Sequence, residues 1–279
     1  MSTPNIHGII GYTITPFSTD GQGLDLDALG RSIDRLIDSG VHAIAPLGST
    51  GEGAYLSDAE WDQVSEFSIA RVAGRVPTVV SVSDLTTAKA VRRARFAQAK
   101  GADVVMVLPA SYWKLSEAEI LAHYQAIGAS IDLPIMLYNN PATSGIDMSV
   151  ELILRIFNAV DNVTMVKEST GDIQRMHKLQ LLGEGQVPFY NGCNPLALEA
   201  FGRGQGLVYC RAEPDPAAQP RPVCGRPGQR PEPGAGVVLS SIAAAGLHPQ
   251  GRFARHHQGR LAYSWPGSRR SASAGFSIG

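Results

Sequence analysis

One lysine lies where a buried amine could act as a nucleophile. Residues 162–166 form a short apolar run rich in β-branched side chains, and Lys167 follows at once, ahead of a polar segment at 168–172. This pattern predicts a buried strand that delivers Lys167 into the loop at its carboxyl end. Burial disfavours the charged form of an amine, and a neutral amine can attack a ketone to form a Schiff base. The alternative is that Lys167 reaches solvent from the strand end and has no chemical role.

A glycine-rich turn with two hydroxyls follows another apolar run. In residues 47–53, Gly48 and Gly51 flank Ser49 and Thr50. The glycines allow a tight turn, and the hydroxyl and N–H groups of such a turn suit the carboxylate of a small keto acid. The alternative is a βα turn that binds nothing. The segment is not a phosphate-binding Walker A loop, because the G-K-[ST] ending is missing.

Two phenols stand at the ends of further predicted strands. Tyr138 closes the run that begins at Ile135, and Tyr112 lies four residues beyond the run that ends at Leu108. A phenol at a strand end can transfer protons to and from a substrate. The alternative for Tyr138 is an aromatic side chain that only fills the interior of a barrel.

The elements that must position these residues alternate between strand and helix up to residue 202. Amphipathic segments separate the apolar runs, and Ser57–Glu60 and Ser116–Glu119 have the pattern of capping boxes at helix starts. A repeat of about 25–30 residues indicates βα units with a parallel sheet. Seven strands with room for an eighth favour a (β/α)8 TIM barrel, whose chemistry lies at the carboxyl ends of its strands. The predicted strands are Ile9–Thr15, His42–Leu47, Thr78–Val82, Val104–Leu108, Ile135–Tyr138, Val163–Val166 and Val187–Tyr190.

The composition is that of an ordinary soluble globular protein. The chain has 279 residues, of which 44% are hydrophobic and 18% charged, with a formal net charge of −1. We see no signal peptide and no apolar run of membrane-spanning length, so we expect a cytoplasmic protein. The three cysteines have neither zinc-ligand spacing nor the even count of a disulfide scaffold.

Three of these segments together resemble a known family. Gly48-Ser-Thr-Gly-Glu52, Tyr138-Asn-Asn-Pro141 and Val166-Lys-Glu-Ser169, in this order and spacing, are similar to those of the dihydrodipicolinate synthase/N-acetylneuraminate lyase family. The resemblance covers about residues 7–202. It implies a (β/α)8 lyase that forms a Schiff base with pyruvate or another 2-keto acid. It also implies a homo-oligomer, a tetramer or dimer, that needs no metal and no cofactor beyond the covalent bond to substrate.

The resemblance assigns a role to each matching residue. Lys167 would be the Schiff-base lysine, and Tyr138 would relay protons to the carbinolamine. Thr50 would hold the substrate carboxylate, and Ser49 would link the tyrosines. Tyr112 would take part in the proton relay of a neighbouring subunit. The other residues expected to bind substrate are Gly48, Gly51, Thr143 and Gly192.

One departure from the family bears on the substrate. Dihydrodipicolinate synthases carry an arginine after the Tyr-x-x-Pro motif, and it binds the carboxylate of aspartate semialdehyde; here that position is Thr143. A hydroxyl cannot replace a bidentate, charged partner. We therefore expect an aldolase or dehydratase of a 2-keto-3-deoxy acid. The alternatives are dihydrodipicolinate synthase activity, and a non-catalytic remnant of the family.

The segment from 203 to 279 differs in composition from the rest. It contains ten Arg, no Lys, three acidic residues and half of the 18 prolines. We expect this aberrant Arg/Pro-rich tail in place of the last βα unit and the C-terminal helices, although 206–210 could form a short strand. A nucleic-acid-binding tail is disfavoured by the scattered arginines and few aromatics. We interpret the tail as a reading-frame shift in a GC-rich gene, and we expect the barrel at 1–202 to be left open, with free edges on its first and seventh strands.

Overall fold

Eight parallel strands form the centre of the molecule. The computed structural model describes residues 6–19, 21–197, 199 and 208–211. The sheet has the order β2-β1-β8-β7-β6-β5-β4-β3, and a parallel bridge between Ile44 and Thr78 joins its two ends into a barrel. The strands are β1 (Ile9–Tyr12), β2 (Ala43–Ala45), β3 (Val79–Ser81), β4 (Val104–Val107), β5 (Ile135–Asn139), β6 (Val163–Glu168), β7 (Phe189–Asn191) and β8 (Val208–Arg211).

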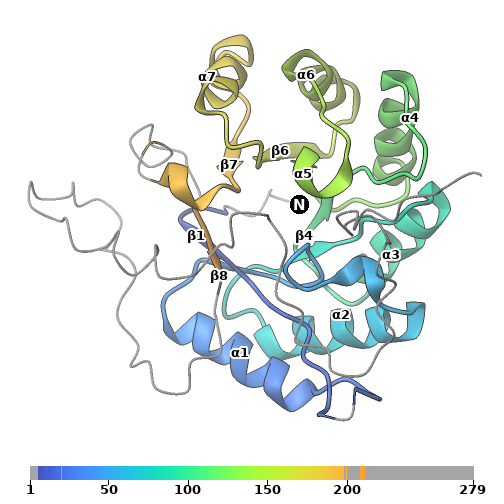
Figure 1. Ribbon diagram of the computed structural model, residues 1–279, viewed down its shortest axis with the longest axis vertical. Helices are drawn as coiled ribbons and strands as arrows, with labels where there is room; N and C mark the ends of the chain where they lie inside the picture. Colours follow the sequence, from blue (N-terminus) through green and yellow to red (C-terminus); the bar gives the residue numbers. More distant parts are fainter. Residues whose placement is uncertain (1–5, 20, 198, 200–207, 212–279) are drawn as a thin grey trace, which may run out of the picture.

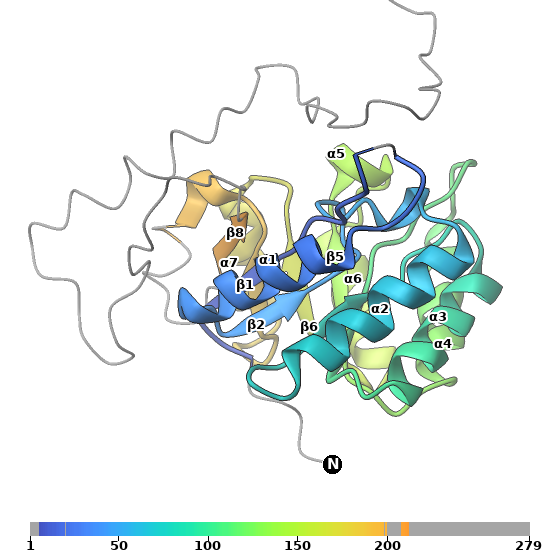
Figure 2. The same cartoon turned by 90° about the horizontal axis from the view of Figure 1, so that it is seen from below.

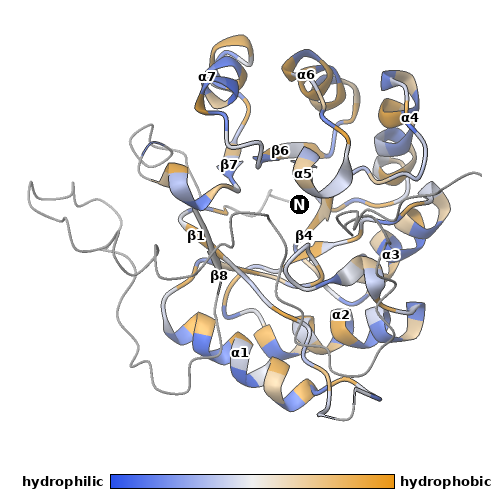
Figure 3. Ribbon diagram, in the orientation of Figure 1, coloured by the Kyte–Doolittle hydropathy of each residue, from blue (hydrophilic) through white to orange (hydrophobic). Residues whose placement is uncertain are grey.

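Helices surround the barrel and cover its strands. Figure 1 shows the longer helices arranged around the strands, and Figure 2 shows the short helix α5 at one end of the barrel. In Figure 3 these helices carry bands of hydrophilic and hydrophobic residues, as amphipathic helices packed on a sheet do. They are α1 (Leu26–Asp38), α2 (Asp58–Val72), α3 (Thr87–Ala99), α4 (Glu117–Gly128), α5 (Pro141–Ser144), α6 (Val150–Ala159) and α7 (Ile173–Leu182), with 3₁₀ turns η1 (Gly53–Tyr55) and η2 (Asn194–Leu196).

The helix boundaries follow the local signals in the sequence. Both capping boxes form: Ser57 and Glu60 bond reciprocally at the start of α2, as do Ser116 and Glu119 at the start of α4. Gly40 follows α1 with a φ of 83°, a left-handed conformation that glycine adopts without a steric penalty. The barrel and the seven strands predicted from the sequence are therefore confirmed, with ends that differ by a few residues.

The eighth strand corrects one expectation. Strand β8 pairs with β1 over four residues, from Ile9↔Val208 to Tyr12↔Arg211, and with β7 through Asn191↔Val208. The barrel is closed, so the expectation of an open barrel with free edges on β1 and β7 was wrong. The strand lies inside the Arg/Pro-rich segment. It can form there because strand pairing depends on backbone N–H and C=O groups, which any non-proline residue supplies. The rest of the predicted tail, 212–279, lies outside the described residues.

Two separate apolar cores lie on the two sides of the strands. Along each strand, side chains alternate between the barrel interior and the layer below the helices. In β5, for example, Met136 and Tyr138 join the interior cluster, whereas Ile135 and Leu137 pack under the helices. In β6, Met165 belongs to the interior cluster, so Lys167, two residues further on, faces inward as well. The alternation of strand side chains therefore decides which strand-end residues can meet.

Candidate active site

Lys167 lies at the inner wall of the barrel, held between two aromatic rings. Its side chain is only 4% exposed. The Nζ atom lies 3.9 Å from the centroid of the Tyr12 ring and 4.0 Å from that of the Tyr138 ring. Ring faces attract a cation, so both contacts help to hold the ammonium group inside the barrel. The alternative that Lys167 extends to solvent does not describe this structure.

Tyr138 stands directly across from Lys167. The two residues are partners in the β5–β6 pairing, and Tyr138 is also 4% exposed. Asn140 donates a hydrogen bond from its side-chain Nδ2 to the phenol oxygen at 2.8 Å. Burial raises the pKa of the phenol, but the Lys167 ammonium and the hydroxyl and amide groups of Asn140, Ser169 and Ser49 outweigh burial, so the pKa of Tyr138 lies below its ordinary value. A buried phenol with a lowered pKa is suited to proton transfer.

The glycine-rich turn after β2 approaches the same phenol. The Ser49 hydroxyl is one of the groups that lower the pKa of the Tyr138 phenol. Gly48 lies against Tyr12, since a Cβ atom at this position would stand 3.5 Å from the Tyr12 ring. Gly51 is required by close backbone packing, because a Cβ atom there would lie 2.9 Å from the backbone nitrogen of Leu47. The turn containing Thr50 is thus tight and close to the buried tyrosines.

Gly192 and Ser169 lie next to Lys167. A Cβ atom at Gly192 would lie 1.7 Å from Ser169 Oγ and 3.0 Å from Lys167 Cε. The Ser169 hydroxyl is buried and close enough to Tyr138 to lower the pKa of that phenol, but it forms no hydrogen bond of regular geometry with any described residue. A buried hydroxyl without a partner is costly, and a bound polar ligand would remove that cost. Sequence reasoning named Gly192 but missed Ser169, although its spacing of two from Lys167 in a strand-end motif was a usable signal.

A buried carboxylate on the outer side of β6 anchors the end of this strand. Glu168 is fully buried, and it accepts hydrogen bonds from Asn139 Nδ2 at 3.1 Å and from the Thr170 N–H at 2.8 Å. Arg175 Nε lies 3.5 Å from the same carboxylate, and Arg175 also pairs with Asp147. These bonds tie the end of β6 to β5 and α7. The sequence analysis did not identify this network, because a Glu beside a lysine reads as an ordinary surface charge.

Two predicted residues do not join the buried group. Tyr112 is 85% exposed, and its ring packs edge-on against Trp113 at a centroid distance of 5.1 Å. Thr143 lies exposed on the short helix α5. Within one chain, therefore, the structure brings together Lys167, Tyr138, Ser49 and Gly192, and it leaves Tyr112 and Thr143 at the surface.

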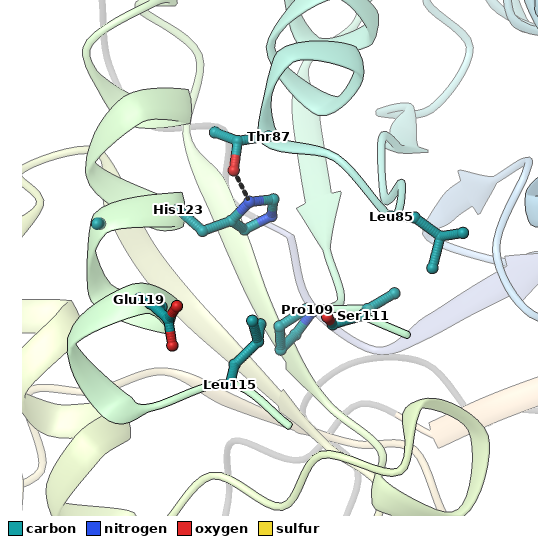
Figure 4. Close-up of a pocket in the computed structure, with 9 residues that line it drawn as sticks. Leu85, Thr87, Pro109, Ser111, Leu115, Glu119 and His123 are labelled. Carbon is teal, nitrogen blue, oxygen red and sulfur yellow. Dashed lines mark hydrogen bonds between the residues drawn. The ribbon is translucent and has the colours of Figure 1, made fainter. Parts of the chain in front are cut away.

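A separate cavity of about 390 Å³ lies between the starts of α3 and α4 (Figure 4). His123 faces this cavity and is hydrogen-bonded through Nδ1 to Thr87 Oγ1 at 2.9 Å. Burial lowers the pKa of His123, and the nearby Asp84 carboxylate offsets part of this effect. The cavity wall includes Pro109, Ala110 and Ser111, which directly precede the exposed Tyr112.

The described residues lack the features of a membrane-spanning segment and of a metal site. None of their helices combines the length and hydropathy needed to cross a bilayer. No group of three or more His, Cys, Asp or Glu side chains in this part of the chain is arranged to hold a metal ion. The candidate site is thus a lysine amine with phenol, hydroxyl and backbone groups around it.

A barrel with an inward lysine at a strand end, faced by a phenol, defines a class of Schiff-base enzymes. Known proteins agree with this assignment. The sequence profile of the Dihydrodipicolinate synthetase family matches residues 5–208. A 4-hydroxy-tetrahydrodipicolinate synthase from Stenotrophomonas maltophilia is 34% identical over 205 residues, which are 73% of this chain and 68% of the relative.

Solved structures give the same result. A candidate dihydrodipicolinate synthetase from Pseudomonas aeruginosa is 76% identical, with a TM-score of 0.72 over 74% of this chain and 71% of its own. YagE, a prophage protein of the dihydrodipicolinic acid synthase family from E. coli K12 in complex with pyruvate, is 28% identical, with a TM-score of 0.69 over 73% of this chain and 69% of its own. The chain belongs to the dihydrodipicolinate synthetase family. The prediction of a Schiff-base lyase that acts on pyruvate or a 2-keto acid is confirmed.

The contact between Gly192 and the lysine leads to the first prediction. The Gly192→Ala variant should form much less pyruvate adduct on borohydride reduction, by about tenfold or more, because its methyl group would occupy space next to Lys167 and Ser169. The adduct is measured by mass spectrometry of the intact protein, alongside thermal unfolding. Gly23→Ala is the matched control, since a Cβ atom at Gly23 meets nothing within 4 Å. Equal adduct yields in both folded variants would show that Gly192 does not border the reacting lysine.

Proposed function

We propose that Lys167 is the nucleophile of a lyase whose substrate is a 2-keto-3-deoxy acid. The observation that carries this proposal is the burial of the Lys167 amine between the Tyr12 and Tyr138 rings, with Tyr138 as its strand partner. The neutral amine attacks the keto carbon and forms an N–C bond, while one N–H proton passes to the keto oxygen. The hydroxyl then leaves as water with a proton from Tyr138. The resulting iminium accepts the electron pair of a C–C bond in an aldol cleavage. In a dehydration it accepts the pair of the adjacent C–H bond, and the enamine so formed expels a hydroxyl with the electrons of its C–O bond.

The surroundings of the lysine support the other proposed roles. The hydroxyls of Ser49 and Ser169 lower the pKa of the phenol, and Ser169 Oγ, which forms no regular hydrogen bond within the described residues, offers one to a substrate oxygen. The tight turn with Thr50 and Gly51 is suited to a carboxylate, through hydroxyl and backbone N–H groups. All of these groups come from the protein, so the proposed reaction needs no metal and no separate cofactor. The small molecule forms its covalent bond with Lys167 alone.

Assembly and location belong to the same proposal. Tyr112 and Trp113 are large exposed aromatic residues, 85% and 77% exposed, beside the cavity of Figure 4. Exposed apolar side chains of this size mark interaction surfaces. We propose that they contact a second copy of the chain in a homo-oligomer, a dimer or tetramer, through which Tyr112 reaches the neighbouring site. A cytoplasmic enzyme without a nucleic-acid or membrane partner accords with the near-neutral net charge.

The second prediction tests the nucleophile. Incubation with pyruvate and borohydride should add one reduced adduct per chain, and peptide mapping should place it on Lys167. The Lys167→Ala variant should give no adduct, while Lys114→Ala, which changes another lysine of the chain, should behave like the original protein. An adduct on a different lysine, or none on folded protein, would contradict the proposed mechanism.

The third prediction concerns the substrate and depends on Thr143. The curated relative from Stenotrophomonas maltophilia is named for the synthase activity, but Thr143 presents no positive charge to a second carboxylate. We expect measurable cleavage or dehydration of a 2-keto-3-deoxy sugar acid, and at least about a hundredfold lower activity with pyruvate and aspartate semialdehyde. A coupled assay for pyruvate release measures activity on the sugar acid, and a condensation assay measures activity with pyruvate and aspartate semialdehyde. Efficient condensation would show that another group binds that carboxylate.

The fourth prediction concerns the C-terminal segment. The family match ends at residue 208, and the 76% identical structure aligns with only 74% of this chain. High identity to a relative that ends within the chain supports a change of reading frame. We propose that this change lies near residue 202. Restoring the frame there should increase the yield of soluble oligomer and of Lys167 adduct, measured by size-exclusion chromatography with light scattering.

The matched control for this experiment is a gene shifted into the third reading frame from the same codon. This control protein has an equally altered tail, and its yields of soluble oligomer and of Lys167 adduct should not increase. If the chain as given already forms a soluble, pyruvate-reactive oligomer in full yield, the frame-shift interpretation is wrong, and the Arg/Pro-rich segment is a functional part of the protein.

A further inference from the structure

The side chain of Asn140 contacts the Tyr138 phenol directly. Its Nδ2 atom donates to Tyr138 Oη at 2.8 Å. Two features fix the position of Asn140. Its carbonyl oxygen accepts hydrogen bonds from the N–H groups of Thr143 at 3.1 Å and Ser144 at 3.0 Å. Pro141 follows it and restricts its backbone, which adopts a φ of −150°. The amide is therefore held in place from its own main chain.

An amide N–H can only donate, so the phenol oxygen is the acceptor in this bond. The proton of the phenol must then point away from Asn140. The Ser49 and Ser169 hydroxyls also act on this phenol and lower its pKa. A donor of this kind stabilises the phenolate more than the phenol, which makes the phenol a stronger acid. Burial acts in the opposite direction.

We propose that Asn140 is a positioning residue that directs the Tyr138 proton towards the substrate and stabilises the phenolate left when water departs from the carbinolamine. The inference rests on the proposed Schiff-base function. In this step the C–O bond of the carbinolamine breaks, the hydroxyl takes the Tyr138 proton and leaves as water, and the nitrogen lone pair forms the C=N bond. The positive iminium at Lys167 and the negative phenolate then face each other, with the Asn140 N–H on the phenolate.

Other titratable groups surround Tyr138 and bear on any pH dependence. Lys167 on β6 lies over the Tyr138 ring, and Tyr12 on β1 shares that lysine. Tyr190 on β7 donates to the Ile6 carbonyl at 3.2 Å, and burial, with Tyr12, raises its pKa to about 12. Glu168 is on the outer side of β6 and is bound to Asn139 and Thr170. Lys167 and Tyr12 are thus the groups whose titration must be separated from that of Tyr138.

The test uses two variants of Asn140 and a matched control. Asn140→Ala removes the donor, and Asn140→Asp replaces the amide with an acceptor of the same shape that carries a negative charge. Asn158→Asp, on the exposed side of α6, introduces the same charge away from the site. NMR of protein labelled with ¹³C at tyrosine Cζ reports the pKa of Tyr138 directly, with the Tyr138→Phe variant assigning its signal and separating it from Tyr12.

We expect the pKa of Tyr138 to rise in Asn140→Ala, to rise further in Asn140→Asp, and to stay unchanged in Asn158→Asp. The rate of pyruvate imine formation, followed by borohydride trapping across the pH range, should fall by about tenfold in Asn140→Asp near neutral pH, since a weaker acid donates its proton less readily. The loss of imine-formation rate in Asn140→Asp should depend on pH, and the pH profile of the rate should shift in parallel with the measured pKa of the phenol.

Two results would overturn the inference. One is an unchanged Tyr138 pKa in both Asn140 variants, and the other is a rate that falls equally at every pH, which indicates a structural role alone. Failure of the proposed function is distinguishable from both. If the original protein forms no adduct at Lys167, the Schiff-base reaction is wrong, whereas the NMR titration still decides whether Asn140 sets the acidity of the phenol.

Discussion

The structure depends on keeping a lysine ammonium inside an apolar barrel. Burial of such a cation costs several kcal/mol, and each contact with a ring face returns about 2 kcal/mol when the site is desolvated. The Tyr12 and Tyr138 rings, both within about 4 Å of Lys167 Nζ, therefore offset part of the cost. The two rings come from β1 and β5, and the lysine from β6, so the barrel brings together three strands to form this contact. Once the ammonium has lost its proton, the amine held in this position can attack a keto carbon placed beside it.

The outer side of β6 supplies much of that fixation. The strand alternates, so Lys167 faces the interior while Glu168 faces the helices, where a buried carboxylate also needs partners. Asn139, next to Tyr138 on β5, donates to Glu168, and the Thr170 N–H does the same from the following loop. One set of bonds thus fixes the strand ends that carry both Lys167 and Tyr138. Reactive groups keep their relative geometry when they stand on rigid strands that hydrogen bonds fix on the outer, helix-facing side.

Much of this arrangement followed from the sequence, because it depends on periodicity and local chemistry. The βα repeat, the capping boxes and the position of Lys167 at a strand end are local features, and each is confirmed. The bond from Asn140 to Tyr138 and the buried network of Glu168 were not predicted. They depend on side-chain direction across neighbouring strands, which a single sequence does not contain. The buried Ser169 hydroxyl was missed for the same reason, since burial is a tertiary property.

The eighth strand shows how far backbone pairing can proceed without the family's sequence. Strand β8 begins at Val208, where the family match ends, and it still pairs with β1 over four residues and with β7 at one position. Backbone hydrogen bonds need a suitable path for the chain more than particular side chains. Barrel closure is thus compatible with an altered sequence, whereas substrate recognition at a strand end is not, because it requires specific side chains. The residues for which chemistry is proposed lie on, or directly after, β1, β2, β5, β6 and β7, which all precede residue 202.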